Sequence, residues 1–156
     1  MAAAEKTLNH RIANGGGHTG WSGAWTANQW ARLKKGNLAN HHIQELLKGR
    51  TIENMLSVHP PFQIDGNFGL TAAIAEMLVQ SHTEYCELLP ALPDAWKKGN
   101  VNGLRLRGGI TVNISWDDGK LMEAELTANQ DTEIKIRYKD VIKSIPLKKN
   151  IAVKFR

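Results

Sequence analysis

The sequence has one cysteine, Cys86, which excludes an internal disulfide framework and a cysteine-based zinc site. We expect a buried or inert thiol there. Long hydrophobic runs are also absent, because the longest, Leu70–Val79, is interrupted by Glu76 and is too short to cross a bilayer. The first 11 residues lack the apolar core of a signal peptide. We therefore expect no membrane partner, while the cellular compartment stays open.

Acidic residues are in deficit only in the second half of the chain. Residues 1–89 hold seven Lys or Arg and seven Asp or Glu, whereas residues 90–156 hold thirteen and eight. There the basic residues alternate with apolar ones, as in 104–107 and 134–137, which is typical of strands with one solvated face. No aromatic residues interleave with them on a nucleic-acid-binding motif. We interpret the charge as a solvated sheet face and expect no nucleic-acid partner.

The first half of the chain has helical periodicity. Aromatic and small residues recur at helical spacing over 21–33, and Gly36-Asn37 breaks this pattern before a second predicted helix over 38–47. A third helix is predicted over 66–82. Its apolar residues cover most of the circumference, which indicates a helix enclosed by other protein. Three helices are too few to enclose it.

After His82 the pattern changes. Residues 83–100 hold two of the five prolines and no clear period, so we predict an ordered connector there. Residues 101–156 predict an antiparallel β domain, in which Trp116 shares the apolar face of its strand and is expected to be buried. The strands are expected to form one meander over 103–107, 110–116, 121–126, 133–138, 141–147 and 151–155.

The segment HPPFQIDGNFG, residues 59–69, gathers polar side chains in a loop directly before the third helix. Asp65 has two candidate roles there. It is well placed to cap the helix, since an aspartate can accept hydrogen bonds from free backbone N–H groups. The residues alone favour this capping role, although a carboxylate where a loop enters a buried helix can also serve acid–base chemistry.

Four segments carry a resemblance to a known family. They are TGWSGAWTANQWARL (19–33), HPPFQIDGNFGLTAAIAEMLVQSH (59–82), LLPALPDAW (88–96) and GLRLRGGITVNISW (103–116). In order and spacing these segments resemble the carboxy-terminal part of glycoside hydrolase family 95, the α-L-fucosidases. The loop at 59–69 favours the fucosidases over the related glucoside phosphorylases and hydrolases.

The resemblance implies an α+β chain cut from a larger enzyme. Such an enzyme has an amino-terminal β domain, an (α/α)6 barrel and a carboxy-terminal β domain. Residues 1–82 would be the last barrel helices, 83–100 the connector, and 101–156 an antiparallel β sheet or sandwich. The implied partners are a fucosylated oligosaccharide and the missing amino-terminal part, and a periplasmic or secreted location fits the parent enzyme.

The resemblance also implies roles for individual residues. Asp65 matches the family's catalytic aspartate, which polarises asparagine side chains that activate water for inverting hydrolysis. Those asparagines and the acidic glutamate would lie upstream of this chain, so we expect the isolated chain to be inactive. The candidate substrate-binding residues are His59, Gln63, Trp21, Ser22 and Asn67.

Several of these residues also have structural interpretations. His59 could equally be a structural group before the two prolines, and Asn67 fits the start of a helix. Trp25 and Trp30 are expected in the core because they recur among alanines at helical spacing. The adjacent histidines His41 and His42 have no apparent third metal ligand, so we assign neither a metal nor a cofactor.

Two functions from different classes remain open at this point. The first is a fucosidase fragment whose apolar helices would drive self-association of the isolated chain. The alternative is a free-standing carbohydrate-binding or scaffold module using Trp116 on its sheet surface. A buried Trp116 would disfavour the alternative.

Overall fold

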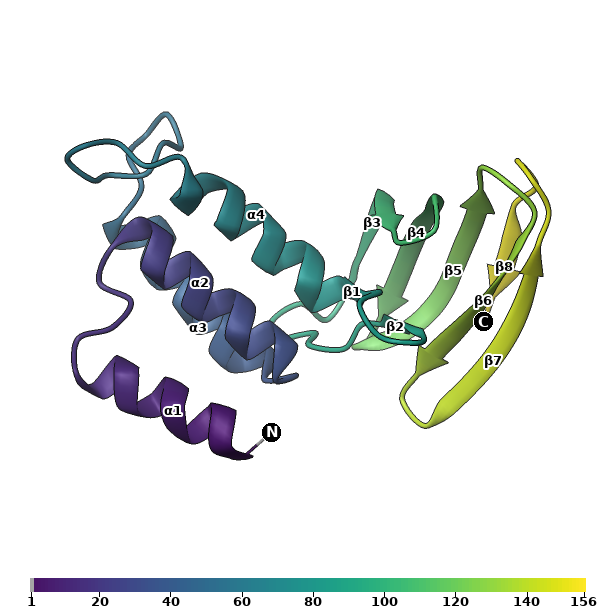
Figure 1. Ribbon diagram of the computed structural model, residues 1–156, viewed down its shortest axis with the longest axis horizontal. Coiled ribbons are helices and arrows are strands. Elements are labelled where there is room, and N and C mark those ends of the chain that lie inside the picture. The colour runs from purple at the N-terminus through teal and green to yellow at the C-terminus, as the bar shows by residue number, and fades with distance from the viewer. Residues whose placement is uncertain (1) are drawn as a thin grey trace. The chain divides into compact units, whose positions relative to one another are not determined.

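Four helices followed by eight strands make up residues 2–156, the part of the chain that this computed structural model describes (Figure 1). This order confirms the α+β class. The chain divides into two units, residues 1–77 and 78–156. The helices are α1 Ala2–Ala13, α2 Gly20–Arg32, α3 Gly36–Gly49 and α4 Asp65–Leu78.

Small residues let the helices of the first unit approach closely. A Cβ atom added to Gly23 of α2 would lie only 2.7 Å from Cδ2 of Leu46 on α3, and one added to Gly69 of α4 would lie 2.8 Å from Cβ of Ala24. Side chains at these glycines would force the backbones apart. The alanines and glycines of the sequence therefore mark the helix contacts.

The helices differ from the sequence predictions at their ends. Helix α2 ends at Arg32, and the break falls at residues 33–35, where Lys34 has a left-handed φ of 61°. Gly36, expected to break a helix, instead begins α3 and is buried. Helix α1 was not predicted from the sequence.

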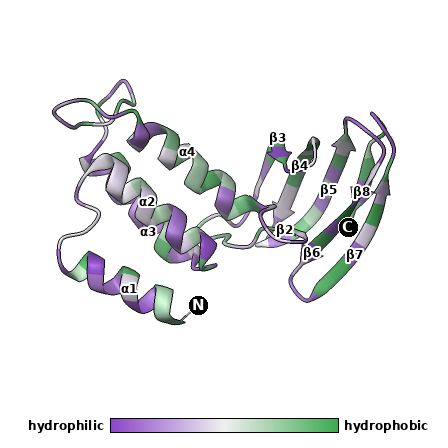
Figure 2. Cartoon of the chain, viewed as in Figure 1, coloured by the Kyte–Doolittle hydropathy of each residue, from purple (hydrophilic) through white to green (hydrophobic). Residues whose placement is uncertain are grey.

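The third predicted helix ends four residues early. Helix α4 stops at Leu78, and β1 Val79–Gln80 pairs antiparallel with β2 Cys86–Leu88. Both residues of β1 are buried, so the end of the apolar run 70–79 forms part of a sheet rather than of the helix. Strand β2 lies inside the segment expected to be a connector. Figure 2 shows α4 itself as hydrophilic at its start and mostly hydrophobic along its body.

The second unit contains two four-stranded sheets rather than one meander. Their strand orders are β1-β2-β6-β7 and β3-β4-β5-β8. The chain crosses between the sheets after β2, after β5 and after β7, and β2 pairs in parallel with β6. The remaining strands are β3 Gly99–Leu106, β4 Ile110–Asp117, β5 Lys120–Ala128, β6 Thr132–Tyr138, β7 Val141–Leu147 and β8 Val153–Phe155.

Alternation of buried and partly exposed residues positions the core of the second unit. On β4, the side chains of Ile110, Val112, Ile114 and Trp116 are buried while those between them are not. Trp116 is 6% exposed, as predicted, and its Nε1 donates a hydrogen bond of 2.7 Å to the Trp96 carbonyl. The opposite face of β4 is left to polar side chains.

The last strand is shorter than predicted. Ile151, expected in the strand with Val153 and Phe155, is 58% exposed and precedes β8. Its backbone N–H bonds to the Lys148 carbonyl in a turn, which takes it out of the sheet. Phe155 alone of the three is buried.

Cys86 provides a test of this packing. The thiol is 2% exposed, and burial, with the charge of Glu87, raises its pKa to about 12. At pH 8 its thiolate fraction is about a thousandfold below that of an exposed thiol. We expect iodoacetamide to alkylate the folded chain at least about a hundredfold more slowly than the urea-unfolded chain, as followed by mass spectrometry. Equal rates would show that β2 is not packed as described.

Candidate active site

The amino-terminal ends of α2 and α4 meet around one buried side chain, that of Ser57. A Cβ atom added to Gly66 would lie 2.7 Å from the Ser57 Oγ, and one added to Gly20 would collide with the same atom. The two glycines also contact each other's backbone, because the Gly66 Cβ would lie 3.2 Å from the Gly20 carbonyl carbon. Helices α2 and α4 therefore start side by side.

Two further contacts keep α2 and α4 parallel along their length. The Asn28 side chain donates hydrogen bonds of 2.8 Å to the carbonyls of Ala24 and Gly69. One turn later, the Arg32 guanidinium binds both carboxylate oxygens of Glu76 at 2.6 and 2.8 Å. Such bidentate pairs fix geometry as well as contribute energy. Neither contact between the helices could be predicted from the sequence, because each joins residues more than 40 positions apart.

Asn67 fastens the preceding loop to the start of α4. Its Nδ2 donates to the Met55 carbonyl at 2.5 Å, and its Oδ1 accepts from the Ser57 N–H at 3.0 Å. Ser57 is also bridged to Thr51, which closes a tight loop. The amide of Asn67 thus has one donor and its acceptor committed to protein, and its observed contacts are structural.

Asp65 occupies the first turn of α4 and is exposed. The backbone N–H groups of Asn67 and Phe68 both bond to the Ile64 carbonyl, which starts the helix one residue before Asp65. Within residues 2–156, the Asp65 carboxylate has no hydrogen-bond or ion-pair partner. The capping interpretation therefore has no contact to support it, and the charge is available to a group outside this chain.

His59 and Gln63 lie earlier in the same loop and are half-buried. The Nδ1 of His59 is 3.0 Å from the Pro61 carbonyl oxygen. A carbonyl can only accept, so Nδ1 carries the proton, and Nε2 of the neutral ring is an acceptor. The Oε1 of Gln63 is buried with no partner in the described part of the chain. Such groups normally have one, so this oxygen marks a place where another group belongs.

Trp21 and Ser22 border a hollow of about 220 Å³ beside the glycine loop at 15–17. Trp25 lies on the same side of α2, and the Arg11 guanidinium stands 5.1 Å from its ring centre. Trp25 is 42% exposed, so the prediction that it belongs to the core is wrong. Its spacing of four from Trp21 places both indoles on one face. Trp30 is buried, as predicted.

Ser22 has a structural task at the start of α2. Its Oγ lies 2.7 Å from the Thr19 Oγ1 and accepts from the Thr19 N–H, while Thr19 Oγ1 accepts from the Ser22 N–H. This reciprocal capping box satisfies free backbone donors and fixes the first turn. Trp21 lies in this first turn of α2, so the capping box also fixes its backbone.

A second hollow, of about 370 Å³, lies between the glycine loop and α3 and includes His18, His41 and His42. Burial and the neighbouring His41 lower the pKa of His42, partly opposed by Glu45. No group of three metal-ligating side chains exists among the described residues. Nor is any helix in residues 2–156 both long and apolar enough to span a membrane.

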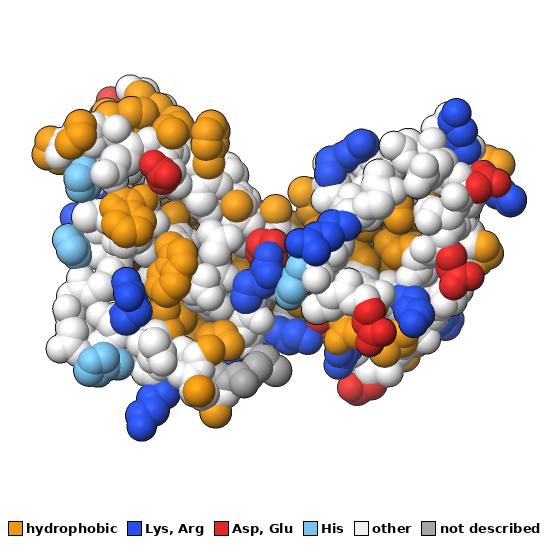
Figure 3. Space-filling model, viewed as in Figure 1, with side chains coloured by type: hydrophobic (Ala, Val, Ile, Leu, Met, Phe, Trp, Pro, Cys, Tyr) orange, Lys and Arg blue, Asp and Glu red, His pale blue; other side chains and the backbone are white. Residues whose placement is uncertain are grey.

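Hydrophobic side chains gather on the face of the helical unit seen in Figure 3, over helices and loop alike. Phe68 is 69% exposed at the start of α4, and Trp21 is 47% exposed. The loop between α3 and α4 adds six more. The large exposed hydrophobic residues of this unit are Trp21, Trp25, Leu38, Ile52, Met55, Leu56, Val58, Phe62, Ile64 and Phe68.

Comparison with protein families matches both units. Residues 1–78 match the glycosyl hydrolase family 95 catalytic domain. Residues 80–155 match the glycoside hydrolase family 95 C-terminal domain. The two matches together cover nearly the entire chain.

Curated relatives include three proteins named as fucosidases. Alpha-L-fucosidase 2 of Arabidopsis thaliana is 46% identical over 151 residues, which is 89% of this chain and 18% of that protein. Probable alpha-fucosidase A of Aspergillus niger is 35% identical over 78% of this chain and 17% of its own length. Its counterpart in Aspergillus oryzae is 32% identical over 76% and 19%. The chain spans about a fifth of the length of these relatives.

The contacts of Asn67 yield a prediction. In Asn67→Asp the donor to Met55 is replaced by an acceptor, which faces the same carbonyl and leaves it unsatisfied. We expect about 1–3 kcal/mol less stability for the loop at 51–58. Faster hydrogen exchange at the Ser57 amide, followed by NMR, is the measurement. Gln44→Glu, on the exposed face of α3, is the matched control and should leave the exchange rate of the Ser57 amide unchanged. If Asn67→Asp also left that rate unchanged, the two hydrogen bonds of Asn67 would not be what holds the loop.

Proposed function

This chain belongs to glycoside hydrolase family 95, and from that membership we propose that it is the carboxy-terminal part of an inverting α-L-fucosidase acting on fucosylated oligosaccharides. The observation that carries the proposal is the placement of Asp65. Its carboxylate is exposed and has no partner in residues 2–156, at the point where α4 starts beside α2. The names of the curated relatives support the choice of substrate.

The role proposed for Asp65 is to help activate the hydrolytic water. Inverting hydrolysis needs an acid at the leaving oxygen and a base function on the opposite face of the sugar, about 6.5–9.5 Å away. An aspartate can serve through side-chain amides that it orients and polarises. In this proposal the amides and the acidic glutamate come from the missing amino-terminal part. No glutamate of this chain is assigned the acid role, and Glu76 is already paired with Arg32.

The surrounding residues are proposed to bind the sugar. Trp21 offers an exposed indole for stacking on a sugar face. His59 offers Nε2 as an acceptor for a hydroxyl, and Gln63 offers a buried Oε1 that has no partner in the described chain. Ser22 and Asn67 are assigned to positioning, because their polar groups hold the first turns of α2 and α4.

The exposed hydrophobic face of the helical unit is proposed to pack against the rest of the barrel. Ten large hydrophobic residues are exposed in residues 2–77 of this unit. Patches of several hundred Å² are uncommon on free-standing domains. In this proposal, the barrel helices absent from this chain pack over these exposed hydrophobic residues.

The alternative, a module that binds sugar through Trp116, has less support. Trp116 is 6% exposed and its indole N–H is bonded to Trp96. A stacking platform needs an exposed ring face, and this one lies in the core of the second unit.

The catalytic role of Asp65 can be tested in the complete enzyme. Asp65→Asn preserves the shape of the side chain but removes the charge. We expect kcat on a fucosylated oligosaccharide to fall by about 10²-fold or more, the scale of a positioned acid–base group, with the fold retained. Release of L-fucose is the measurement.

The matched control is Glu53→Gln, which removes an exposed carboxylate from the same loop region. Its kcat should stay within about twofold of wild type. If Asp65→Asn also turned over at the wild-type rate, the catalytic assignment would have to be withdrawn.

The isolated chain offers a second test. Without the upstream acid and amides it should release no L-fucose, and its uncovered helices should drive self-association, measurable by sedimentation velocity. Phe68→Ser should shift the chain toward monomer, since it removes the most exposed large hydrophobic residue of α4. Met122→Ser, in the second unit, should not. A monomer whose helical amides resist exchange would contradict the proposed missing cover.

A further inference from the structure

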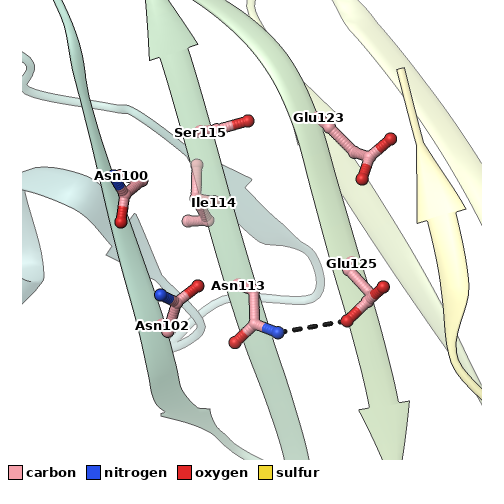
Figure 4. A pocket seen from close by; sticks show the side chains of 7 residues that line it. All are labelled: Asn100, Asn102, Asn113, Ile114, Ser115, Glu123 and Glu125. Atoms are coloured by element: carbon pink, nitrogen blue, oxygen red, sulfur yellow. Dashed lines mark hydrogen bonds between the residues drawn. The ribbon is translucent and has the colours of Figure 1, made fainter.

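The second unit has a polar hollow of about 230 Å³ on the exposed face of β3, β4 and β5 (Figure 4). The buried face of β4 carries the core, so the alternate residues point outward to this side. Cross-strand pairing brings them together, since Asn100 lies opposite Ser115, and Asn113 opposite Glu125. The polar lining consists of Asn100, Asn102, Asn113, Ser115, Glu123 and Glu125.

Part of this lining is held rigidly. The Asn113 Oδ1 accepts from the Gly103 N–H at 2.9 Å, and its Nδ2 donates to Glu125 at 3.1 Å. Lys154 binds Glu123 at 2.8 Å, and Arg156 binds the same carboxylate. These hydrogen bonds hold the pKa of Glu123 below its usual range. The hollow therefore keeps the Glu123 carboxylate ionised and in place, and Asn113 orients Glu125.

The rest of the lining is available to a ligand. Within residues 2–156, the side chains of Asn100, Asn102 and Ser115 have no hydrogen-bond partner. Together they offer two amides and a hydroxyl, each able to donate and to accept. Three such groups lie beside carboxylate acceptors that are already oriented.

The charges indicate a neutral ligand. Lys154 and Arg156 both bind Glu123, while Glu125 accepts from the neutral Asn113 amide. These four charged side chains together carry no net charge, so the hollow favours neither an anion nor a cation. Oriented carboxylates and amides without net charge match the vicinal hydroxyl groups of a sugar, each of which can donate and accept. The volume is below the usual range for drug-sized ligands and suits one ring.

We propose that this hollow is a binding site for one neutral pyranose residue of a glycan, separate from the hydrolytic site. It is distinct from a Trp116 surface, because Trp116 points to the opposite face of β4. The choice of a glycan as ligand rests on the proposed function, whereas the binding itself requires no catalysis. The site would hold a sugar residue of an oligosaccharide on the second unit.

The test is an NMR titration of the ¹⁵N-labelled 156-residue chain with L-fucose and, separately, D-galactose. We expect saturable shifts confined to amides of residues 100–102, 113–115 and 123–125 with at least one sugar. Loss of two hydrogen-bonding groups in the double variant Asn102→Ala, Ser115→Ala should weaken binding about tenfold. Gln130→Ala, an exposed residue outside the hollow, is the control and should bind as wild type.

Absence of saturable shifts with both sugars would overturn the proposal without any variant. Equal affinity in the folded double variant, checked by its unperturbed amide spectrum, would overturn it too. The titration is independent of the proposed function, because Asp65→Asn should bind as wild type. If the complete enzyme released no L-fucose but sugar still bound at the hollow, only the fucosidase proposal would be refuted. If the enzyme released L-fucose but no sugar bound at the hollow, only the proposed binding site would be refuted.

Discussion

The close approach of α2 and α4 at Gly20 and Gly66 is the constraint on which the candidate active site depends. With no side chain at either glycine, Ser57 fits between the two helix starts, and the loop that it ends is held by Asn67. The contact places Asp65 and Trp21, each next to one of these glycines in sequence, at the same end of the helical unit. The geometry of this candidate site is thus set by small residues rather than by Asp65 itself.

The same end of the unit holds groups whose partners are absent from the described residues. Asp65 carries an unpaired charge, Gln63 has a buried acceptor without a donor, and Phe68 is 69% exposed. Buried polar groups are nearly always satisfied in complete proteins, and large apolar surfaces are covered. These features support a chain that works as part of a larger enzyme, in agreement with its span of about a fifth of its relatives.

Local patterns predicted much of the fold. Helical spacing located α2 and α3, and alternation located β4 and its buried Trp116. What failed depended on distant partners: Val79–Gln80 continues a helical pattern but pairs with β2, and Trp25 has core-like spacing yet faces outward. The loop pattern alone singled out Asp65 and the family resemblance implied its catalytic role, whereas the contacts of Asn28, Ser57 and Asn67 could be found only in the structure. The polar hollow on β3–β5 was hidden because its residues come from three strands and look like an ordinary solvated face.

The most direct measurement of the central claim is kcat/KM of Gly66→Ala in the complete enzyme, compared with Gly49→Ala. A methyl group on Gly66 would press on Ser57, while one on Gly49 meets nothing within 4 Å. Since small misplacements of catalytic groups cost up to about 10²-fold, we predict a loss of at least about tenfold for folded Gly66→Ala and none for Gly49→Ala. Wild-type kcat/KM in Gly66→Ala would contradict the claim that this helix contact positions the active site.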